Sequence, residues 1–383
     1  QNTTGTENSA LGSQALLSNT TGDANIAIGY EALDANSTGS NNTAVGRSSL
    51  GANTTANSNT ALGYYALKVN TTGADNVAVG GNSLDANTTA NNNTAVGKSS
   101  LGNNTTGANN TGLGWGALGQ NTTASNNVAV GYNCLGANTT GTENVAVGTN
   151  ALDANTTASN NTAVGNSALG ANTTGSENTA LGYSALENNT TGASNTAVGA
   201  YALEENVDGG NHTAVGYLAL TATTGSNNNT AIGKDSLRDT TSGDDNTGCG
   251  TFTLRANTTG QYNVAVGRGA LINNNADSNT AVGRGSLYAN TTGTRNVAVG
   301  DLALDANTTG NYNVALGYGS LGANTASNNV AIGYDALTAN TTGGNNIAVG
   351  YQALNANTTA SNSVAIGYQA LYTCTTGAEN IAI

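Results

Sequence analysis

Few residues in this 383-residue chain could carry out chemistry, and their spacing does not favour it. The chain has one histidine, His212, and three cysteines, Cys134, Cys249 and Cys374. Catalysis and metal binding both need several such side chains to converge. His212 has no fixed acid or nucleophile partner in the sequence, and the cysteines lie too far apart to pair within the chain. We therefore predict no enzyme activity, no catalytic residues, no metal site and no cofactor.

The most frequent chemical motif is Asn-Thr-Thr, which is an acceptor sequence for N-linked glycans. The same residues also favour tight turns without any modification. The motif therefore predicts either a column of glycans or a column of turns. The candidate glycan sites are Asn19, Asn53, Asn70, Asn87, Asn104, Asn121, Asn138, Asn155, Asn172, Asn189, Asn257, Asn290, Asn307, Asn340 and Asn357.

These motifs belong to a repeat of 17 residues that runs through the whole chain. The Gly of the Ala-(Val/Ile/Leu)-Gly motif recurs from Gly12 to Gly367, and only the steps Gly267–Gly283 and Gly317–Gly333 have 16 residues. A fixed period of this size is typical of a solenoid, in which each repeat is one coil. Asn, Thr and Gly disfavour helix, so we expect two short strands and two or three turns in each coil.

The columns of the repeat predict the environment of each position, counted from the Asn of a coil such as Asn76–Asn92. Position 4 is Val, Ile or Leu except at Cys249, and position 9 is Leu, so both are expected in the dry interior. Position 2 should lie at the edge of that interior. Position 6 carries Tyr, Trp, Lys, Arg and Asp, which indicates solvent exposure.

Position 3 is Ala in every coil apart from Gly112 and Gly248. Strand alternation would point this residue away from the interior that positions 2 and 4 define. Its constant small size then implies that another backbone packs against it. We expect either a second chain on this Ala/Gly face or a tight fold of the same coil.

Asn recurs at positions 1 and 12, and Gly or Ala occurs at position 15. Stacked Asn side chains can form amide ladders between coils. The fold class that we predict is an all-β parallel β-solenoid, or β-roll, with about 17 residues per coil and about 22 coils. Residues 1–383 should form one continuous repeat domain, and because both ends fall within a repeat we expect an internal segment of a longer array.

Composition excludes several partners. Charged residues make up 8% of the chain and the net charge is −13, so a basic surface for nucleic acid is missing. No apolar run approaches the length of a membrane span, and we expect no membrane insertion.

The segment Asn362–Gly367 reads Asn-Ser-Val-Ala-Ile-Gly and resembles the head repeat of trimeric autotransporter adhesins. The longer form, Ala-Val-Gly-Tyr-x-Ala-Leu-x-Ala-Asn-Thr-Thr-Gly, is similar to repeats of bacterial and phage tail-fibre-like proteins. The resemblance implies a left-handed β-roll that assembles as a trimer outside the cell, with the small Ala face near the threefold axis. The 17-residue coil is longer than is usual in those heads.

Taken together, the sequence predicts a structural extracellular fibre, filament or adhesin-type surface shaft without catalysis. Its partner would be another copy, in a trimer or filament, joined through the Ala/Gly face. The alternative is a module that binds host or surface glycans through aromatic side chains at position 6, namely Tyr64, Trp115, Tyr183 and Tyr351. A minor alternative is an ice-binding solenoid, although the Thr residues gather at a corner and form no outward Thr-x-Thr strand.

Overall fold

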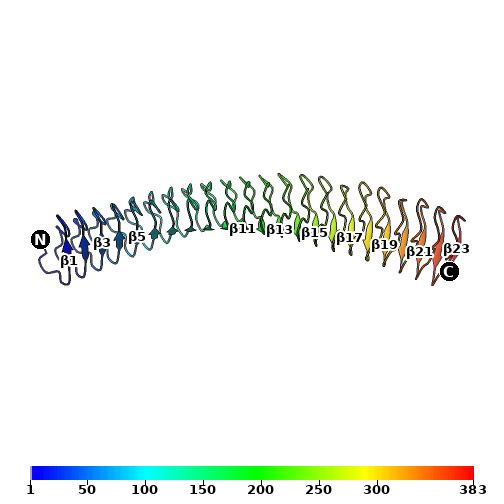
Figure 1. Cartoon of the computed structure of the whole chain (residues 1–383), viewed down its shortest axis with the longest axis horizontal. Coiled ribbons are helices and arrows are strands. Elements are labelled where there is room, and N and C mark those ends of the chain that lie inside the picture. The colour runs from blue at the N-terminus through cyan, green and yellow to red at the C-terminus, as the bar shows by residue number, and fades with distance from the viewer. Residues whose placement is uncertain (1) are drawn as a thin grey trace. The chain divides into compact units, whose positions relative to one another are not determined.

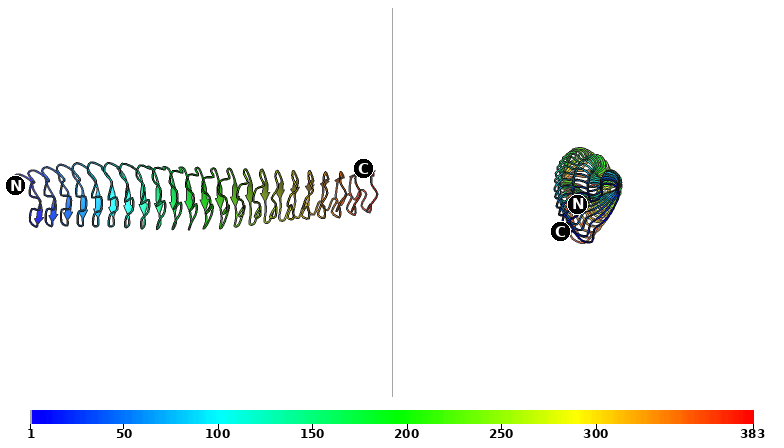
Figure 2. Two further views of the ribbon diagram at one scale, coloured as in Figure 1. Left: turned by 90° about the horizontal axis from the view of Figure 1, so that it is seen from above. Right: turned by 90° about the vertical axis from the view of Figure 1, so that its left-hand side faces the viewer.

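The structure is a computed structural model that describes residues 2–383, and it is an all-β parallel solenoid with one short strand in each coil (Figure 1). The chain divides into two compact units, Gln1–Ser194 and Asn195–Ile383. In both units successive coils follow the same path (Figure 2). The predicted fold class, coil length and number of coils are confirmed, but each coil has one strand where two were expected.

The first unit contains strands β1 (Ser9–Leu11), β2 (Ile26–Ile28), β3 (Thr43–Val45), β4 (Thr60–Leu62), β5 (Val77–Val79), β6 (Thr94–Val96), β7 (Thr111–Leu113), β8 (Val128–Val130), β9 (Val145–Val147), β10 (Thr162–Val164) and β11 (Thr179–Leu181). The second unit contains β12 (Thr196–Val198), β13 (Thr213–Val215), β14 (Thr230–Ile232), β15 (Thr247–Cys249), β16 (Val264–Val266), β17 (Thr280–Val282), β18 (Val297–Val299), β19 (Val314–Leu316), β20 (Val330–Ile332), β21 (Ile347–Val349), β22 (Val364–Ile366) and β23 (Ile381–Ala382). Each strand covers positions 2 to 4 of its coil.

Neighbouring strands within a unit pair in parallel, and equal positions of the repeat face each other. Thr43 pairs with Thr60, and Ala44 pairs with Ala61, so each column of the sequence becomes a continuous column on the molecule. The backbone ladder continues outside the strands, because Leu33 N–H donates to Ser49 O at 3.1 Å. A residue's environment is therefore set by its position in the repeat.

The interior of the coil is narrow, and the Ala of position 3 lies inside it. Ala78 and Leu84 are both fully buried, whereas Val77 and Val79 are half-buried on the opposite side of the strand. The prediction that position 4 forms the interior, with position 2 at its edge, is therefore wrong. Of the two positions predicted to lie in the interior, only position 9 does so. The Ala/Gly column cannot serve as a contact face for a second chain, because the coil itself folds tightly around it.

The two exceptions at position 3 show how little space the interior offers. A Cβ at Gly112 would lie 2.5 Å from Ser100 Oγ, and one at Gly248 would lie 2.6 Å from Ser236 Oγ. Without that Cβ, the Ser100 hydroxyl donates to Gly112 O at 2.8 Å. Glycine at position 3 thus compensates for a hydroxyl that points across the interior.

Buried asparagines form the predicted amide ladders. At position 12, Asn53 Nδ2 donates to Asn36 Oδ1 at 2.9 Å and to Ala56 O at 3.1 Å. At position 1, Asn42 Nδ2 donates to the same carbonyl, Ala56 O, at 2.9 Å. The carbonyl at position 15 therefore accepts two amides in this coil, which satisfies polar groups that would otherwise be costly to bury.

The two 16-residue coils lose their residue at the corner that follows position 12. Asn274 Nδ2 and Asn324 Nδ2 donate to the carbonyls of Ala276 and Ala326, two residues further on, at 2.8 and 2.9 Å. In the other coils with Asn at position 12 the acceptor is three residues on, as for Asn53. The deletion shortens one turn. It interrupts the position 12 ladder, because Asn257 Oδ1 accepts no hydrogen bond from Asn274. The position 1 ladder continues, since Asn279 N–H donates to Asn263 Oδ1 at 2.9 Å.

Candidate functional site

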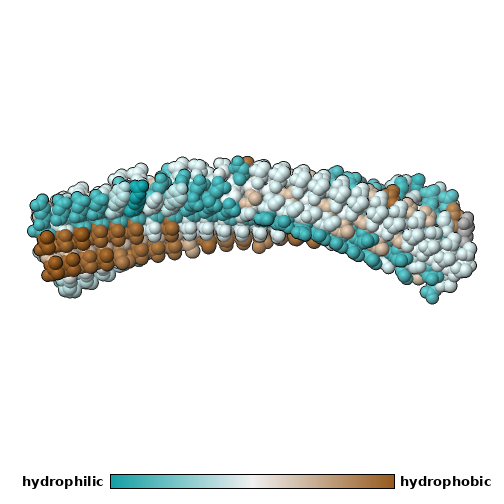
Figure 3. Space-filling model, turned by 180° about the vertical axis from the view of Figure 1, so that it is seen from behind, coloured by the Kyte–Doolittle hydropathy of each residue, from teal (hydrophilic) through white to brown (hydrophobic). Residues whose placement is uncertain are grey.

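The outward side of the sheet carries the apolar side chains of positions 2 and 4. Across five consecutive coils of the second unit both columns are entirely aliphatic, and Figure 3 shows them as two brown rows. We call these ten residues the aliphatic face: Val297, Val299, Val314, Leu316, Val330, Ile332, Ile347, Val349, Val364 and Ile366. No charged residue occurs in either column, so this face differs from the variable surface at position 6.

Much of this aliphatic face is open to solvent. Leu316 is 45% exposed, and Ile347 and Ile366 are each 40% exposed. Complete burial of such a side chain is worth about 1.5–3 kcal/mol, so covering the ten residues would release roughly 5–10 kcal/mol for each copy. Exposed apolar patches of this extent commonly mark interaction sites. The face is a candidate interaction surface of the second unit.

A tyrosine column at position 6 lies beside the aliphatic face. Tyr318, Tyr334, Tyr351 and Tyr368 stack one on the next, with ring centroids 5.1, 5.4 and 5.3 Å apart and rings tilted by 12° or less. Both faces of the Tyr351 ring are consequently covered by neighbouring rings. Tyr351 therefore presents only its edge and hydroxyl to a ligand, which is poor geometry for stacking on a sugar.

The other aromatics singled out from the sequence lie in different coils of the first unit. Tyr64 stacks on Tyr65 at 3.8 Å, and Trp115 stacks on Tyr132 at 4.9 Å. Tyr183 is 52% exposed. The prediction that position 6 faces solvent is confirmed, but the structure does not bring Tyr64, Trp115, Tyr183 and Tyr351 into one site.

The candidate glycan sites at position 12 are all fully buried in the folded coils. Their side-chain nitrogen, to which a glycan would be attached, is used in the amide ladder; Asn121 Nδ2 donates to Asn104 Oδ1 at 2.8 Å and to Ala124 O at 3.0 Å. This burial argues against modification of a coil after it has folded. Glycan attachment stays a prediction, and the intact mass of the native protein would test it.

His212 takes the place of an Asn at position 1 and reproduces its hydrogen bonds. Its Nε2 lies 2.7 Å from Ser226 O, and its Nδ1 accepts the N–H of Asn229 at 3.2 Å. This arrangement fixes the neutral tautomer that carries its proton on Nε2. Burial lowers the pKa of His212 below its ordinary value of 6.5. The side chain is fully engaged in holding coils together.

The three cysteines occupy three different columns. Cys134 is buried at position 8, Cys249 is exposed at position 4, and Cys374 is half-buried at position 12. All three are free thiols. Burial raises the pKa of the Cys134 thiol to about 12, so that thiol is unreactive near neutral pH.

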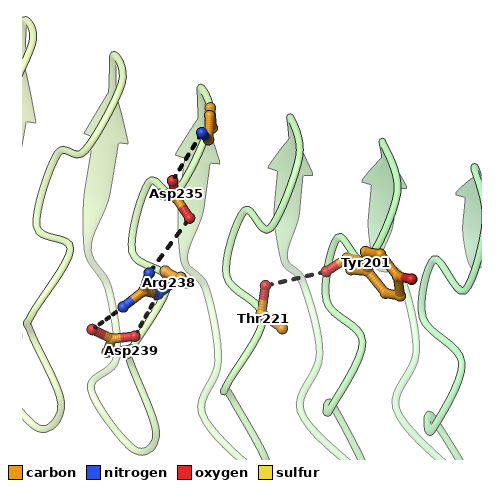
Figure 4. Close-up of polar contacts among 6 residues, drawn as sticks. Tyr201, Thr221, Asp235, Arg238 and Asp239 are labelled. Carbon is orange, nitrogen blue, oxygen red and sulfur yellow. Dashed lines mark hydrogen bonds and ion pairs between the residues drawn. The ribbon is translucent and has the colours of Figure 1, made fainter.

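The densest charge cluster surrounds Arg238 in the second unit (Figure 4). The Arg238 guanidinium donates to both carboxylate oxygens of Asp239, at 2.7 and 3.0 Å, and lies 3.7 Å from Asp235. Lys234 Nζ lies 3.9 Å from the same Asp235 carboxylate. In the neighbouring part of Figure 4, Thr221 Oγ1 donates to Tyr201 O at 3.2 Å. The ion pairs of Arg238 lie within a single coil, whereas the bond from Thr221 to Tyr201 joins neighbouring coils.

Within residues 2–383, no group of three or more His, Cys, Asp or Glu side chains is placed to hold a metal ion. The same residues contain no helix that is long and apolar enough to cross a membrane.

Comparison with known proteins adds no family assignment to this geometry. The sequence matches no protein-family model, and no curated protein is significantly similar to it.

Proposed function

We propose that this chain is a non-catalytic structural protein that self-associates through the aliphatic face of its second unit. The observation that carries the proposal is the unbroken pair of aliphatic columns on strands β18 to β22. A second copy repeats these columns with the same spacing, so the two faces match along their whole length. The free energy released by covering both faces is similar in size to the cost of association, which is about 4–15 kcal/mol.

The proposed role is that of a fibre, filament or adhesin-type shaft at the cell surface. Its extracellular placement and three-copy assembly rest on the resemblance of Asn362–Gly367 to adhesin head repeats, as does a left-handed coil. The contact face differs from the one inferred from the sequence, because the small Ala column is enclosed by the coil and the Val, Ile and Leu columns are outside.

Threonine substitutions at position 2 would test the proposal with little risk to the fold. Position 2 is Thr in many coils, for example Thr43 and Thr60, so the backbone already accepts it. The variant combines Val314→Thr, Val330→Thr, Ile347→Thr and Val364→Thr. Its matched control carries the same change in the first unit, as Ile26→Thr, Val77→Thr, Val128→Thr and Val145→Thr.

Sedimentation equilibrium over a range of concentrations is the measurement. We expect the unaltered chain and the control to associate, and the second-unit variant to dissociate at least tenfold more readily. The number of copies in the assembly would distinguish a trimer from a filament. An unaltered chain that stays monomeric at all concentrations, or two variants that behave alike, would contradict the proposal.

The ice-binding alternative would need an outward strand of the form Thr-x-Thr, and the strands of this structure do not have that form. Outward Thr residues such as Thr94 are followed at position 4 by an aliphatic residue such as Val96. A thermal hysteresis measurement tests this alternative independently of self-association.

A further inference from the structure

A polar trough crosses the first unit where three successive coils have Gly at position 10. Gly102, Gly119 and Gly136 line it, and in the same column Asp85 and Asp153 occupy the coils before and after. The trough has a volume of about 360 Å³, within the size range of small-ligand sites. This is the only run of three glycines in the position 10 column. The depression therefore arises from side chains that are missing in consecutive coils.

The single tryptophan of the chain borders this trough. Trp115 is 48% exposed, and Tyr132 stacks on one face of its indole at 4.9 Å with 12° between the planes. That stacking holds the ring in place. An indole beside a polar depression offers a flat apolar surface next to hydrogen-bonding groups, which is the combination that sugar rings need.

Side-chain amides supply those hydrogen-bonding groups. Asn103 and Gln120 both occupy position 11, where most coils carry Ala, and Asn103 Nδ2 donates to Gln120 Oε1 at 3.0 Å. Asn82 and Asn133 line the trough as well. An amide presents both donors and acceptors, so this lining can bond to hydroxyl groups in either direction.

The side-chain oxygen of one of these amides has no hydrogen-bond donor. The Oδ1 atom of Asn82 is buried and accepts no hydrogen bond from any described residue. A buried acceptor without a partner costs about 1–3 kcal/mol. Because this oxygen has almost no exposed surface, a ligand hydroxyl reaches it only if the Asn82 side chain turns toward the trough. A hydrogen bond formed in that way would remove the cost.

Charge selects among possible ligands. The carboxylate of Asp85 lines the trough, no Lys or Arg does, and the whole chain has a net charge of −13. An anionic ligand would meet repulsion without any compensating cation. The lining groups therefore favour binding of a ligand that is rich in hydroxyls and carries no negative charge.

We propose that the trough around Trp115 binds a neutral carbohydrate, with a sugar ring beside the indole and its hydroxyls bonded to Asn82, Asn103, Gln120 and Asp85. This site is independent of the proposed self-association, because it lies in the first unit and away from positions 2 and 4. It also differs from a general aromatic surface, since Tyr351 has both ring faces covered.

The single Trp makes the test specific to this site. Trp115 fluorescence of the full chain would be titrated with neutral hexasaccharides of glucose, mannose, xylose and N-acetylglucosamine, and with an oligogalacturonate as the anionic comparison. We expect a saturable change with at least one neutral sugar and none with the oligogalacturonate. Isothermal titration calorimetry with the same sugar would confirm binding.

Matched glycine variants separate binding from folding. In Gly102→Asn a side chain fills the trough, whereas Gly170→Asn makes the same change outside it. A Cβ at Gly102 would lie 3.3 Å from Ser99 O, and one at Gly170 would lie 3.3 Å from Ser167 O, so the two sites tolerate the change equally. We expect Gly102→Asn to weaken binding at least tenfold and Gly170→Asn to leave it unchanged.

Three results would overturn the proposal: no response to any neutral sugar at millimolar concentration, a response to the oligogalacturonate alone, or equal binding by the two glycine variants. Because the sugar panel reports on Trp115 and sedimentation reports on the second unit, failure of one proposal leaves the other standing.

Discussion

At the scale of single residues, the repeat is governed by contacts between equal positions of adjacent coils. Position 15 shows this clearly: Ala56, Ala90, Ala124 and Ala158 occur in alternate coils, and the coils between them carry Gly. A Cβ at Gly107 would lie only 2.0 Å from Ala124 O of the next coil. A side chain at Gly107 therefore fits only if the two coils shift apart at this corner.

We expect Gly107→Ala to lower the free energy of unfolding by about 1–3 kcal/mol, as overpacking of a close contact usually does. Gly81→Ala is the control, because the nearest atom to its new Cβ would be 4.0 Å away. Denaturant unfolding of the two variants gives the comparison. Equal stability of both would show that the corner adjusts freely.

The buried His212 predicts a dependence of stability on pH. Its folded pKa lies below the unfolded value of 6.5, so under mildly acidic conditions the unfolded chain binds a proton that the folded chain does not. Stability should therefore fall as the pH drops below about 6.5, and the fall should end once the folded histidine also protonates.

His212→Asn restores the residue that most coils carry at position 1 and removes this titration. Thermal unfolding between pH 7 and pH 5 should show a smaller loss of stability in the variant than in the unaltered chain. The difference between the two proteins cancels the titration of carboxylates. Identical pH profiles would mean that His212 is not buried as a neutral ring.

At the scale of the element, each coil is held by its amide ladders more than by a large apolar core. We expect Asn121→Ala to cost about 2–5 kcal/mol, because it removes two donated bonds and the bond that Asn121 Oδ1 accepts from Asn138 at 3.0 Å. The exposed Asn166→Ala serves as control and should change little. Hydrogen exchange would locate the loss in the coils next to Asn121, and uniform protection there would contradict the account.

The sequence predicted the environment of several positions in a coil, but it assigned the inner and outer sides of the strand wrongly. The Leu column at position 9, the solvent-exposed position 6 and the Asn ladders could all be inferred from residue type. Alternation along a strand does not tell which of its two sides faces the interior. The larger side chains at positions 2 and 4 suggested that their side did. The coil is too narrow for them, as the contact between Ser100 and Gly112 shows.

The backbone conformations of the turns could not be predicted from the sequence. Leu84 and Leu101 adopt left-handed backbone conformations, with φ of 52° and 51°, which aliphatic residues rarely do. Hydrogen bonds to the next coil hold this geometry, since Leu84 N–H donates to Ser100 O at 3.0 Å. The trough at Trp115, by contrast, has a visible sequence signal, since three glycines, two amides and the only Trp coincide in the repeat.

At the scale of the whole molecule, the proposed assembly is defined by the surface that joins one copy to another. Cys249 provides a native reporter, because it lies at position 4 of β15, on the outward side of the sheet and outside the aliphatic face. Cys134 is buried and its thiol will not react. With Cys374→Ser as background, a spin label can be placed on Cys249 alone.

The most direct test is the distance between spin labels on Cys249 of different copies, measured by pulsed dipolar EPR. Packed sheets lie about 10 Å apart, so association through the outward side in parallel register predicts a label separation of roughly 15–35 Å. This short distance should disappear in the four-threonine variant of the second unit. The absence of any dipolar signal at concentrations where the chain sediments as an oligomer would contradict the account, because the copies would then be joined elsewhere.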